Sequence, residues 1–467
     1  MPKPSRASTL PSQYPFHKLE NVVLSPHRGG AVGQTEAENL RWDALRKSSS
    51  PLQKHTPKHQ TTTDIPSFPT ASTSNAATDP HRTAHQKTKN PMPDSTTTKS
   101  PYYPIFDGHN DVLLSLAMPE HGKNRSFFEE SEIGHLDLPR AKKGGFAAGF
   151  FAIFIPNPDL EKPPTDDDDD DDDDNDKEKF DWVKARREGT IPLPDPLDFD
   201  YAQTKANDLA DLLFNLEKQS NNQFQVVTTT TQIENNIKNN IVSAILHLEG
   251  AEPIAPDLSN LITWYDRGLR SIGLVWSRPN AFAHGVPFHC PASPETGPGL
   301  TEAGKELVHA CNELGIMIDL SHLNQNGVRD VANISKKPLV ATHSCAHAVC
   351  PSARNLTDQQ LDLIKQSNGL VGCNFFVGDV RPDGGMNKEG GLAYQLQQIN
   401  YLVDKMGIEH VAFGSDFDGA TMPDELKDAA HYPNLIAELQ NAGYTNDQLS
   451  LLTHRNFLRI LNETWNS

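Results

Sequence analysis

From residue 100 onward, short apolar runs alternate with amphipathic stretches, and this alternation limits the folds open to the chain. The runs are continuously apolar, which is typical of parallel strands that are buried on both faces. Stretches such as TEAGKELVHACNELG end in glycine just before the next run, as helices commonly do. The predicted strands are Ile105–His109, Phe146–Ile155, Ala244–Glu249, Ser271–Trp276, Ile316–Leu320, Leu339–His343, Leu370–Phe375 and His410–Ser415.

Eight such strands, each followed by helical sequence, predict the α/β class and a (β/α)₈ TIM barrel. We assign residues 100–467 to this single domain. The sequence contains no apolar run near the ~18 to 20 residues that a membrane-spanning helix requires, so we expect no transmembrane segment.

Two segments lack the pattern of a packed core. Residues 1–99 are rich in Ser, Thr, Pro, Gln and His and show no apolar period, so we interpret them as a disordered N-terminal tail. Met92 lies close to the first strand and is a hypothetical alternative start of translation. Residues 162–179 contain nine consecutive aspartates, which we interpret as a solvated acidic loop insertion rather than a weak calcium or basic-partner site.

The charge distribution bears on the partners of the chain. The whole chain has a formal net charge of -19, and residues 1–99 carry more Lys and Arg than Asp and Glu, so the domain is more acidic still. Such a domain repels nucleic acid and anionic membranes, which favours a small-molecule partner. The first twenty residues lack an apolar signal segment, and the five cysteines are odd in number and form no CxxC pairs. We therefore expect a cytoplasmic protein without a disulfide framework.

Metal-binding side chains stand at the ends of several predicted strands. His109 and Asp111 follow the first, Glu249 the third, His322 the fifth and His343 the sixth, and a barrel brings all these ends to one rim. The HxD spacing points both side chains the same way in extended chain, which suits a zinc-type metal. A lone HxD arises by chance, and a strand-end histidine is often structural. Together, however, these residues predict a two-zinc hydrolytic centre bridged by the glutamate.

Other polar residues near the rim have competing interpretations. Asp416, at the eighth strand end, is placed to exchange protons with metal-bound water, and Asp418 is the alternative for this role. Arg354 follows the sixth strand and suits a substrate carboxylate, unless it forms a surface ion pair with Asp358. His247 shares a strand face with the predicted bridging glutamate and stays unassigned.

The motifs FDGHND, LHLEGAEP, GLVWSRPNAFAHGV, IDLSHLN, THSCAHAV, RNLTDQQL and GSDFDG resemble, in this order, those of the membrane dipeptidase (renal dipeptidase) family. This family consists of zinc metallopeptidases of the amidohydrolase superfamily, and the resemblance covers about residues 100–462. It implies a binuclear zinc barrel that hydrolyses dipeptides through a metal-bridging hydroxide. The implied roles are metal binding by His109, Asp111, Glu249, His322 and His343, catalysis by Glu249 and Asp416, and substrate binding by Arg354 and Asp416.

The sequence departs from the family at one position. Trp276 stands where the mammalian enzymes have a histidine that helps to hold the substrate carbonyl, and His284 in the same loop is a candidate replacement. We include both among the substrate-binding residues. Members of the family commonly form homodimers, so a homodimer is one expected assembly.

Two other functions compete with a dipeptidase. A lactonase or deaminase of the same superfamily typically opens with HxH and often bridges its metals with a carbamylated lysine, whereas this chain has Asp111 and Glu249. A non-catalytic barrel scaffold would have no need of the complete ligand set. The sequence therefore favours a zinc-dependent dipeptidase.

Overall fold

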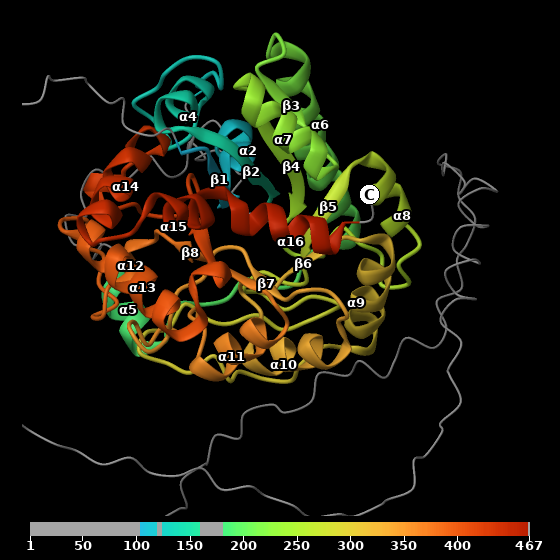
Figure 1. The fold of residues 1–467 in the computed structure, drawn as a ribbon. Coiled ribbons are helices and arrows are strands. Elements are labelled where there is room, and N and C mark those ends of the chain that lie inside the picture. Colours follow the sequence, from blue (N-terminus) through green and yellow to red (C-terminus); the bar gives the residue numbers. More distant parts are fainter. Residues whose placement is uncertain (1–102, 119–123, 159–180, 466–467) are drawn as a thin grey trace, which may run out of the picture. The chain divides into compact units, whose positions relative to one another are not determined.

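The computed structural model describes residues 103–118, 124–158 and 181–465 (Figure 1). The predicted tail at residues 1–99, the hypothetical start at Met92 and the acidic insertion at residues 162–179 lie outside the described residues.

The described strands form one parallel sheet that closes into a barrel. The sheet order is β2-β1-β9-β8-β7-β6-β5-β4-β3, and an additional pairing of β2 with β4 closes a ring of eight strands. The predicted TIM barrel is therefore confirmed (Figure 1). The strands are β1 (Ile105–Asn110), β2 (Phe146–Ile153), β3 (Phe224–Val226), β4 (Val242–Leu248), β5 (Leu269–Gly273), β6 (Met317–Asp319), β7 (Val340–Ala341), β8 (Leu370–Asn374) and β9 (Val411–Gly414).

Each of the eight predicted strands corresponds to one strand of the barrel. The sequence did not predict β3, the remaining described strand. β3 is only three residues long and pairs with β4 alone, outside the closed ring. Several predicted strands also end earlier than expected. Glu249, Trp276, His322 and His343 lie just beyond their strands, in the loops of the rim.

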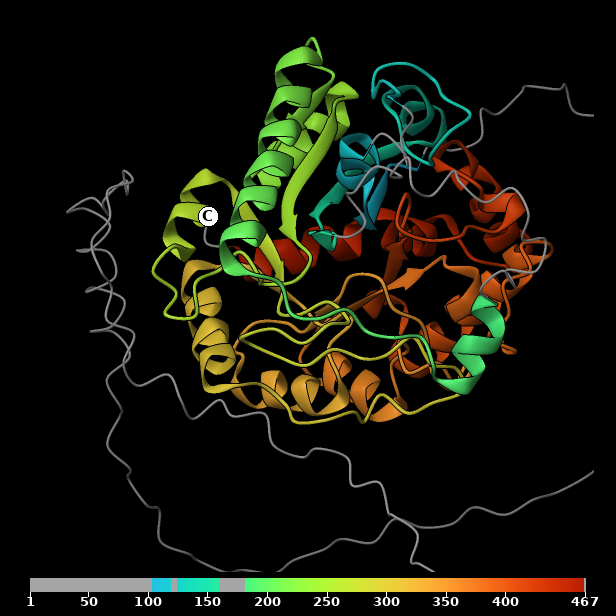
Figure 2. The ribbon, with the colours of Figure 1, turned by 180° about the vertical axis from the view of Figure 1, so that it is seen from behind.

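Helices surround the barrel, and local sequence sets many of their ends (Figure 2). Three capping boxes begin helices, with Thr229, Thr357 and Thr445 accepting a bond from the backbone three residues on. The helices are α2 (Val112–Ala117), α4 (Leu138–Gly144), α5 (Trp182–Glu188), α6 (Phe199–Gln219), α7 (Thr230–Asn239), α8 (Leu261–Arg267), α9 (Glu302–Leu314), α10 (Gln325–Ile334), α11 (Asp358–Gln366), α12 (Val377–Val380), α13 (Gly391–Met406), α14 (Tyr432–Asn441), α15 (Asn446–Ser450) and α16 (Asn456–Thr464). Among the described residues, none of these helices is both long and apolar enough to cross a membrane.

Helix α16 covers one end of the barrel. Its Phe457, Ile460 and Leu461 belong to a buried apolar cluster with residues from near the starts of several barrel strands, including Phe106 of β1. The rings of Phe106 and Phe457 stack with their centroids 4.7 Å apart. Because this apolar cluster fills the amino-terminal end of the barrel, the polar side chains gather at the carboxyl ends of the strands.

A buried carboxylate joins the first strand to the last. Asp107 of β1 accepts hydrogen bonds from the backbone N–H of Ser415 at 2.7 Å and from its hydroxyl at 2.9 Å. The hydroxyl of Tyr432, the first residue of α14, donates a third bond to Asp107 at 3.1 Å. These bonds lie beside the pairing of β1 with β9, where the first and the last strand of the chain meet in the ring.

Candidate metal centre

The five predicted metal ligands come together at the carboxyl-terminal rim of the barrel. His109 lies within β1 and Asp111 directly follows it, while Glu249 comes immediately after β4. His322 and His343 stand on the loops after β6 and β7. All five side chains are buried, so the unpaired nitrogen and oxygen atoms of this group are largely removed from water.

The two oxygens of Glu249 face different partners. Its Oε2 lies 3.4 Å from His109 Nε2, which in turn lies 3.3 Å from Asp111 Oδ2. Its Oε1 lies 3.1 Å from His322 Nε2 and 3.7 Å from His343 Nε2. Each oxygen therefore belongs to a separate set of three residues whose ligand atoms lie within 4.8 Å of one another.

The donor atoms of both sets fit divalent metal ions. Both ring nitrogens of His109 and the Oδ1 of Asp111 are buried without a hydrogen-bond partner in the described part of the chain. Buried polar atoms without partners are costly, and a cation would satisfy them. Imidazole nitrogen with carboxylate oxygen is also the donor set that zinc prefers.

The electrostatics favour the metal-binding forms of Glu249, His322 and His343. Without metal, His109 and Asp111 differ: although burial lowers the pKa of His109, the charges of Glu249 and Asp111 raise it well above its usual value, and burial raises the pKa of Asp111 to about 7. Burial alone would raise the pKa of Glu249, but neighbouring His109 and His322 hold it well below its usual range. Burial, reinforced by the charge of Arg354, lowers the pKa of His322 to about 4. Burial also lowers the pKa of His343 well below its usual value, with His109 adding to the shift. Glutamate is therefore ionised and these two histidines are neutral at pH 7, as coordination requires.

Asp416 lies next to the first set of ligands. A Cβ atom added at Gly419 would come within 2.1 Å of Asp111 Oδ2 and 2.7 Å of Asp416 Oδ1, so both carboxylates face the same small space. The other oxygen of Asp416 accepts a bond from Asn374 Nδ2 at 2.9 Å. Desolvation raises the pKa of Asp416, and the negative charge of Glu249 adds to this shift. Asp416 is thus suited to proton transfer.

The competing choice, Asp418, has a structural role instead. Its Oδ2 accepts a hydrogen bond from Arg125 at 3.0 Å, and its Oδ1 accepts one from the backbone N–H of His135 at 2.6 Å. Because both of its oxygens accept hydrogen bonds, Asp418 holds the loop after β9 against residues 125–135. The structure therefore favours Asp416 over Asp418.

Arg354 is buried beside the second set of ligands. Its guanidinium donates to the hydroxyl of Ser344 and to the carbonyl oxygen of His343, both at 2.9 Å. The alternative ion pair with Asp358 is wrong, because Asp358 accepts a bond from Tyr401 at 2.7 Å and lies near Lys405. A guanidinium has five N–H donors, so Arg354 keeps others beyond these two bonds.

Trp276 and His284 lie on the long loop after β5. The ring centroid of Trp276 is 5.9 Å from that of His322, and the half-buried Trp276 also packs against Phe154 and Phe288. The loop of His284 runs alongside the ligand, since the N–H of Val286 donates to the carbonyl of His322 at 3.0 Å. The ring contact with His322 places Trp276 beside the second set of ligands.

Sequence reasoning missed a further carboxylate in the centre. Asp319, the last residue of β6, accepts bonds at Oδ1 from the N–H groups of Ser321 and Thr342, both at 2.9 Å. Its Oδ2 lies 3.6 Å from Nε2 of His247, the histidine that the sequence left unassigned. Asp319 could have been found as a strand-end carboxylate in IMIDLSH, but its partners Thr342 and His247 come from two other segments of the chain.

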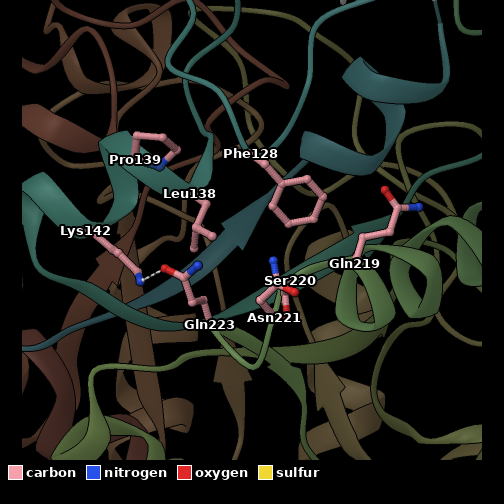
Figure 3. Close-up of a pocket in the computed structure, with 8 residues that line it drawn as sticks. All are labelled: Phe128, Leu138, Pro139, Lys142, Gln219, Ser220, Asn221 and Gln223. Carbon is pink, nitrogen blue, oxygen red and sulfur yellow. Dashed lines mark hydrogen bonds between the residues drawn. The ribbon is translucent and has the colours of Figure 1, made fainter.

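A separate cavity of about 320 Å³ opens elsewhere on the barrel (Figure 3). It is lined by residues around the start of α4 and the end of α6, including Leu138, Lys142 and Gln223. None of the candidate metal ligands lines it, so this cavity is distinct from the metal centre.

Comparison with known proteins agrees with this geometry. Residues 100–466 match the family model of the membrane dipeptidases, peptidase family M19. The structure superposes on a metallopeptidase from Rhodobacter sphaeroides, liganded with a phosphinate mimic of the dipeptide L-Ala-D-Ala, with a TM-score of 0.71 and 43% identity. That comparison covers 78% of this chain and 100% of the Rhodobacter chain.

Curated sequences are also similar to this chain. An uncharacterized protein of Klebsiella pneumoniae is 41% identical over 271 residues, which are 58% of this chain and 98% of that protein. Dipeptidase aclJ of Aspergillus oryzae is 28% identical over 364 residues, which are 77% of this chain and 78% of that protein.

The barrel and its cluster of histidines and carboxylates define a metal-dependent hydrolase of the metallopeptidase class. Within that class, the chain belongs to the membrane dipeptidase family, peptidase family M19. The predicted family is therefore confirmed, and the lactonase, deaminase and scaffold alternatives are not favoured.

Proposed function

We propose that the protein is a two-zinc dipeptidase whose metals are held by His109, Asp111, Glu249, His322 and His343. The observation that carries this proposal is the arrangement around Glu249, whose two oxygens face two separate ligand sets. When bound, two zinc ions supply Lewis-acid polarisation of the scissile carbonyl and a water that is activated near neutral pH.

The other residues position the substrate and move a proton. Arg354 has free N–H donors beside the second ligand set and orients the C-terminal carboxylate of the substrate. Asp416 accepts a proton as the attack begins and returns it to the departing amine. A carboxylate clamp one residue from the scissile bond selects dipeptides over longer chains. Trp276 forms an apolar wall next to His322, where related enzymes have a histidine.

The test is to purify the full chain, measure zinc per chain by plasma mass spectrometry, and assay dipeptides with and without chelator. The panel contains L-Ala-D-Ala, because the Rhodobacter relative is liganded with a mimic of that dipeptide, together with L-Ala-L-Ala and the matching tripeptide. We expect close to two zinc ions per chain, chelator-sensitive cleavage of a dipeptide, and recovery of activity on zinc addition. Dipeptide turnover that persists after the metals are removed would contradict the proposal.

We further propose a reducing, cytoplasmic location. All five cysteines are buried free thiols. The sulfurs of Cys290 and Cys350 lie 4.0 Å apart and form no disulfide bond. Cell fractionation tests this location. A homodimer stays a prediction, which light scattering of the purified chain tests.

A further inference from the structure

We propose that Thr342 is a positioning residue that fixes the ring tautomer of His343, so that His343 presents a bare Nε2 to its metal. This inference rests on the proposed metal centre and adds a part to it. The part is a relay that runs from the carboxylate of Asp319 through the hydroxyl of Thr342 to Nδ1 of His343.

The first link of the relay lies between Asp319 and Thr342. The hydroxyl of Thr342 is in short hydrogen-bond contact with Asp319 Oδ2. The other oxygen of Asp319 already accepts two backbone N–H groups, from Ser321 and Thr342. A carboxylate surrounded by donors in this way is held in its ionised form, which can only accept hydrogen bonds. The single hydroxyl proton of Thr342 therefore points to Asp319.

The second link follows from counting protons. Thr342 Oγ1 lies 2.9 Å from His343 Nδ1, and its only hydrogen is already donated to the carboxylate. The oxygen must therefore accept, which requires a proton on Nδ1. In a neutral imidazole the other nitrogen then carries a lone pair. Nε2 of His343 is thus an acceptor.

The free lone pair faces the other metal-binding atoms. Nε2 of His343 lies 3.1 Å from Nε2 of His322 and 3.7 Å from Oε1 of Glu249. A lone pair aimed at a second nitrogen and a carboxylate oxygen is favourable only where a proton on His322 Nε2 or a cation lies between them, and a bound metal would take the place of that proton. The relay therefore prepares His343 for a metal before the metal arrives.

The backbone holds Thr342 firmly in this place. β7 ends after only two residues, and the carbonyl oxygen of Thr342 turns toward the neighbouring strands. A Cβ atom added at Gly108, Gly372 or Gly414 would lie 2.1, 1.9 or 2.0 Å from this oxygen, respectively. Glycines on three strands therefore make room for the carbonyl, so the backbone of Thr342 is closely packed.

The experiment measures zinc affinity rather than turnover. Metal-free wild type, Thr342→Val and Thr342→Ser are titrated with zinc against a chelator of known affinity, and folding is checked by thermal denaturation. We expect Thr342→Val to lose roughly 10–100-fold in affinity at one of two sites, as loss of an outer hydrogen-bond partner typically does. The serine variant retains the hydroxyl and should stay close to wild type.

Thr453→Val is the matched control. Thr453 is also buried, and its hydroxyl lies 3.0 Å from Nδ1 of the next residue, His454, away from the metal ligands. This control should bind both zinc ions with wild-type affinity. An equal loss in Thr342→Val and Thr453→Val would show a general folding effect and overturn the inference.

A second variant tests the direction of the relay. Asp319→Asn keeps the size of the side chain but can donate to Thr342, so that the hydroxyl donates to Nδ1 and the tautomer of His343 is reversed. We expect this variant to lose zinc affinity as Thr342→Val does. If both variants bind two zinc ions as tightly as wild type, the relay is wrong, whereas a wild type that binds no zinc overturns the proposed function as well.

Discussion

Two residues of the candidate centre adopt backbone angles that side chains other than glycine usually avoid. His322 has φ of 67° and Asp416 has φ of 63°. Such left-handed positions cost free energy and persist only where the surroundings hold them. The carbonyl of His322 accepts a bond from Val286, and the N–H of Asp416 donates to the carbonyl of His109 at 3.0 Å. At these two positions the backbone strain therefore lies where the side chains face the proposed metal centre.

The backbone of Asp416 determines how its role should be tested. Asparagine tolerates the left-handed region better than most residues, so Asp416→Asn keeps the loop intact while removing the base. We expect kcat for a dipeptide to fall roughly 10²–10⁴-fold, which is the usual contribution of a positioned proton-transfer group. Zinc content and Tm should stay at wild-type values. A variant that loses zinc as well would show that Asp416 holds the metal centre rather than transferring protons.

His454, remote from the centre, should make stability depend on pH. Burial, with the charge of neighbouring Arg455, lowers the pKa of His454 from 6.5 to about 4. Between these values the unfolded chain binds a proton that the folded chain does not, so stability is full above pH 6.5 and falls as the pH approaches 4. We expect the protonation of this residue to lower the free energy of unfolding by on the order of 1–3 kcal/mol.

The measurement compares Tm at pH 7.5 and pH 5.5 with chelator present, so that metal binding does not contribute. His454→Gln should lose less stability than wild type over this interval. His309→Gln, which changes an exposed histidine on α9, is the control and should lose as much as wild type. Equal losses in all three proteins would contradict the assigned role of His454.

At the scale of elements, the packing of the short strand β7 requires glycine at facing positions of the neighbouring strands. A Cβ on Gly372 of β8 would lie 1.9 Å from the carbonyl oxygen of Thr342. Gly372→Ala should therefore force β7 outward at a cost of about 1–3 kcal/mol, as overpacking typically does. Calorimetry should show a lower Tm, and zinc affinity should fall because Thr342 moves.

Gly273→Ala on β5 is the control for this substitution. Its added Cβ would come no closer than 3.3 Å to the nearest atom outside its neighbours. We expect a clearly smaller change in Tm. If the two variants lose the same stability, close packing around Thr342 is not the cause.

The elements also show how far the sequence can predict this site. The eight barrel strands were predictable because each is an apolar run bounded by helical sequence, and the five ligands were predictable because each stands at or shortly after the end of a strand. Strand β3 could not be predicted, because its three residues, FQV, are too few to show a pattern. The role of Thr342 could not be predicted either, because it depends on where one hydroxyl proton points, and the carboxylate of Asp319 on a neighbouring strand decides that.

At the scale of the whole molecule, bound metal would join four strand ends of the barrel. The proposed ligands come from β1 and from the loops after β4, β6 and β7. Because only the folded chain brings them together, zinc should stabilise it, by about 2.7 kcal/mol for each site at a free concentration of 100 times Kd. We expect chelation to lower Tm by several degrees and zinc to restore it. A Tm that does not respond to chelator would contradict a metal centre of this kind.

The bonds between β1 and β9 have a consequence for the synthesis of the chain. About 300 residues separate the end of β1 from the start of β9, which a ribosome adds in roughly 15 to 60 s. Throughout that time Asp107 has no Ser415, and the backbone of His109 has no Asp416, to hold it. The first ligand is therefore fixed only after nearly the whole chain has been made, so zinc would enter a finished barrel.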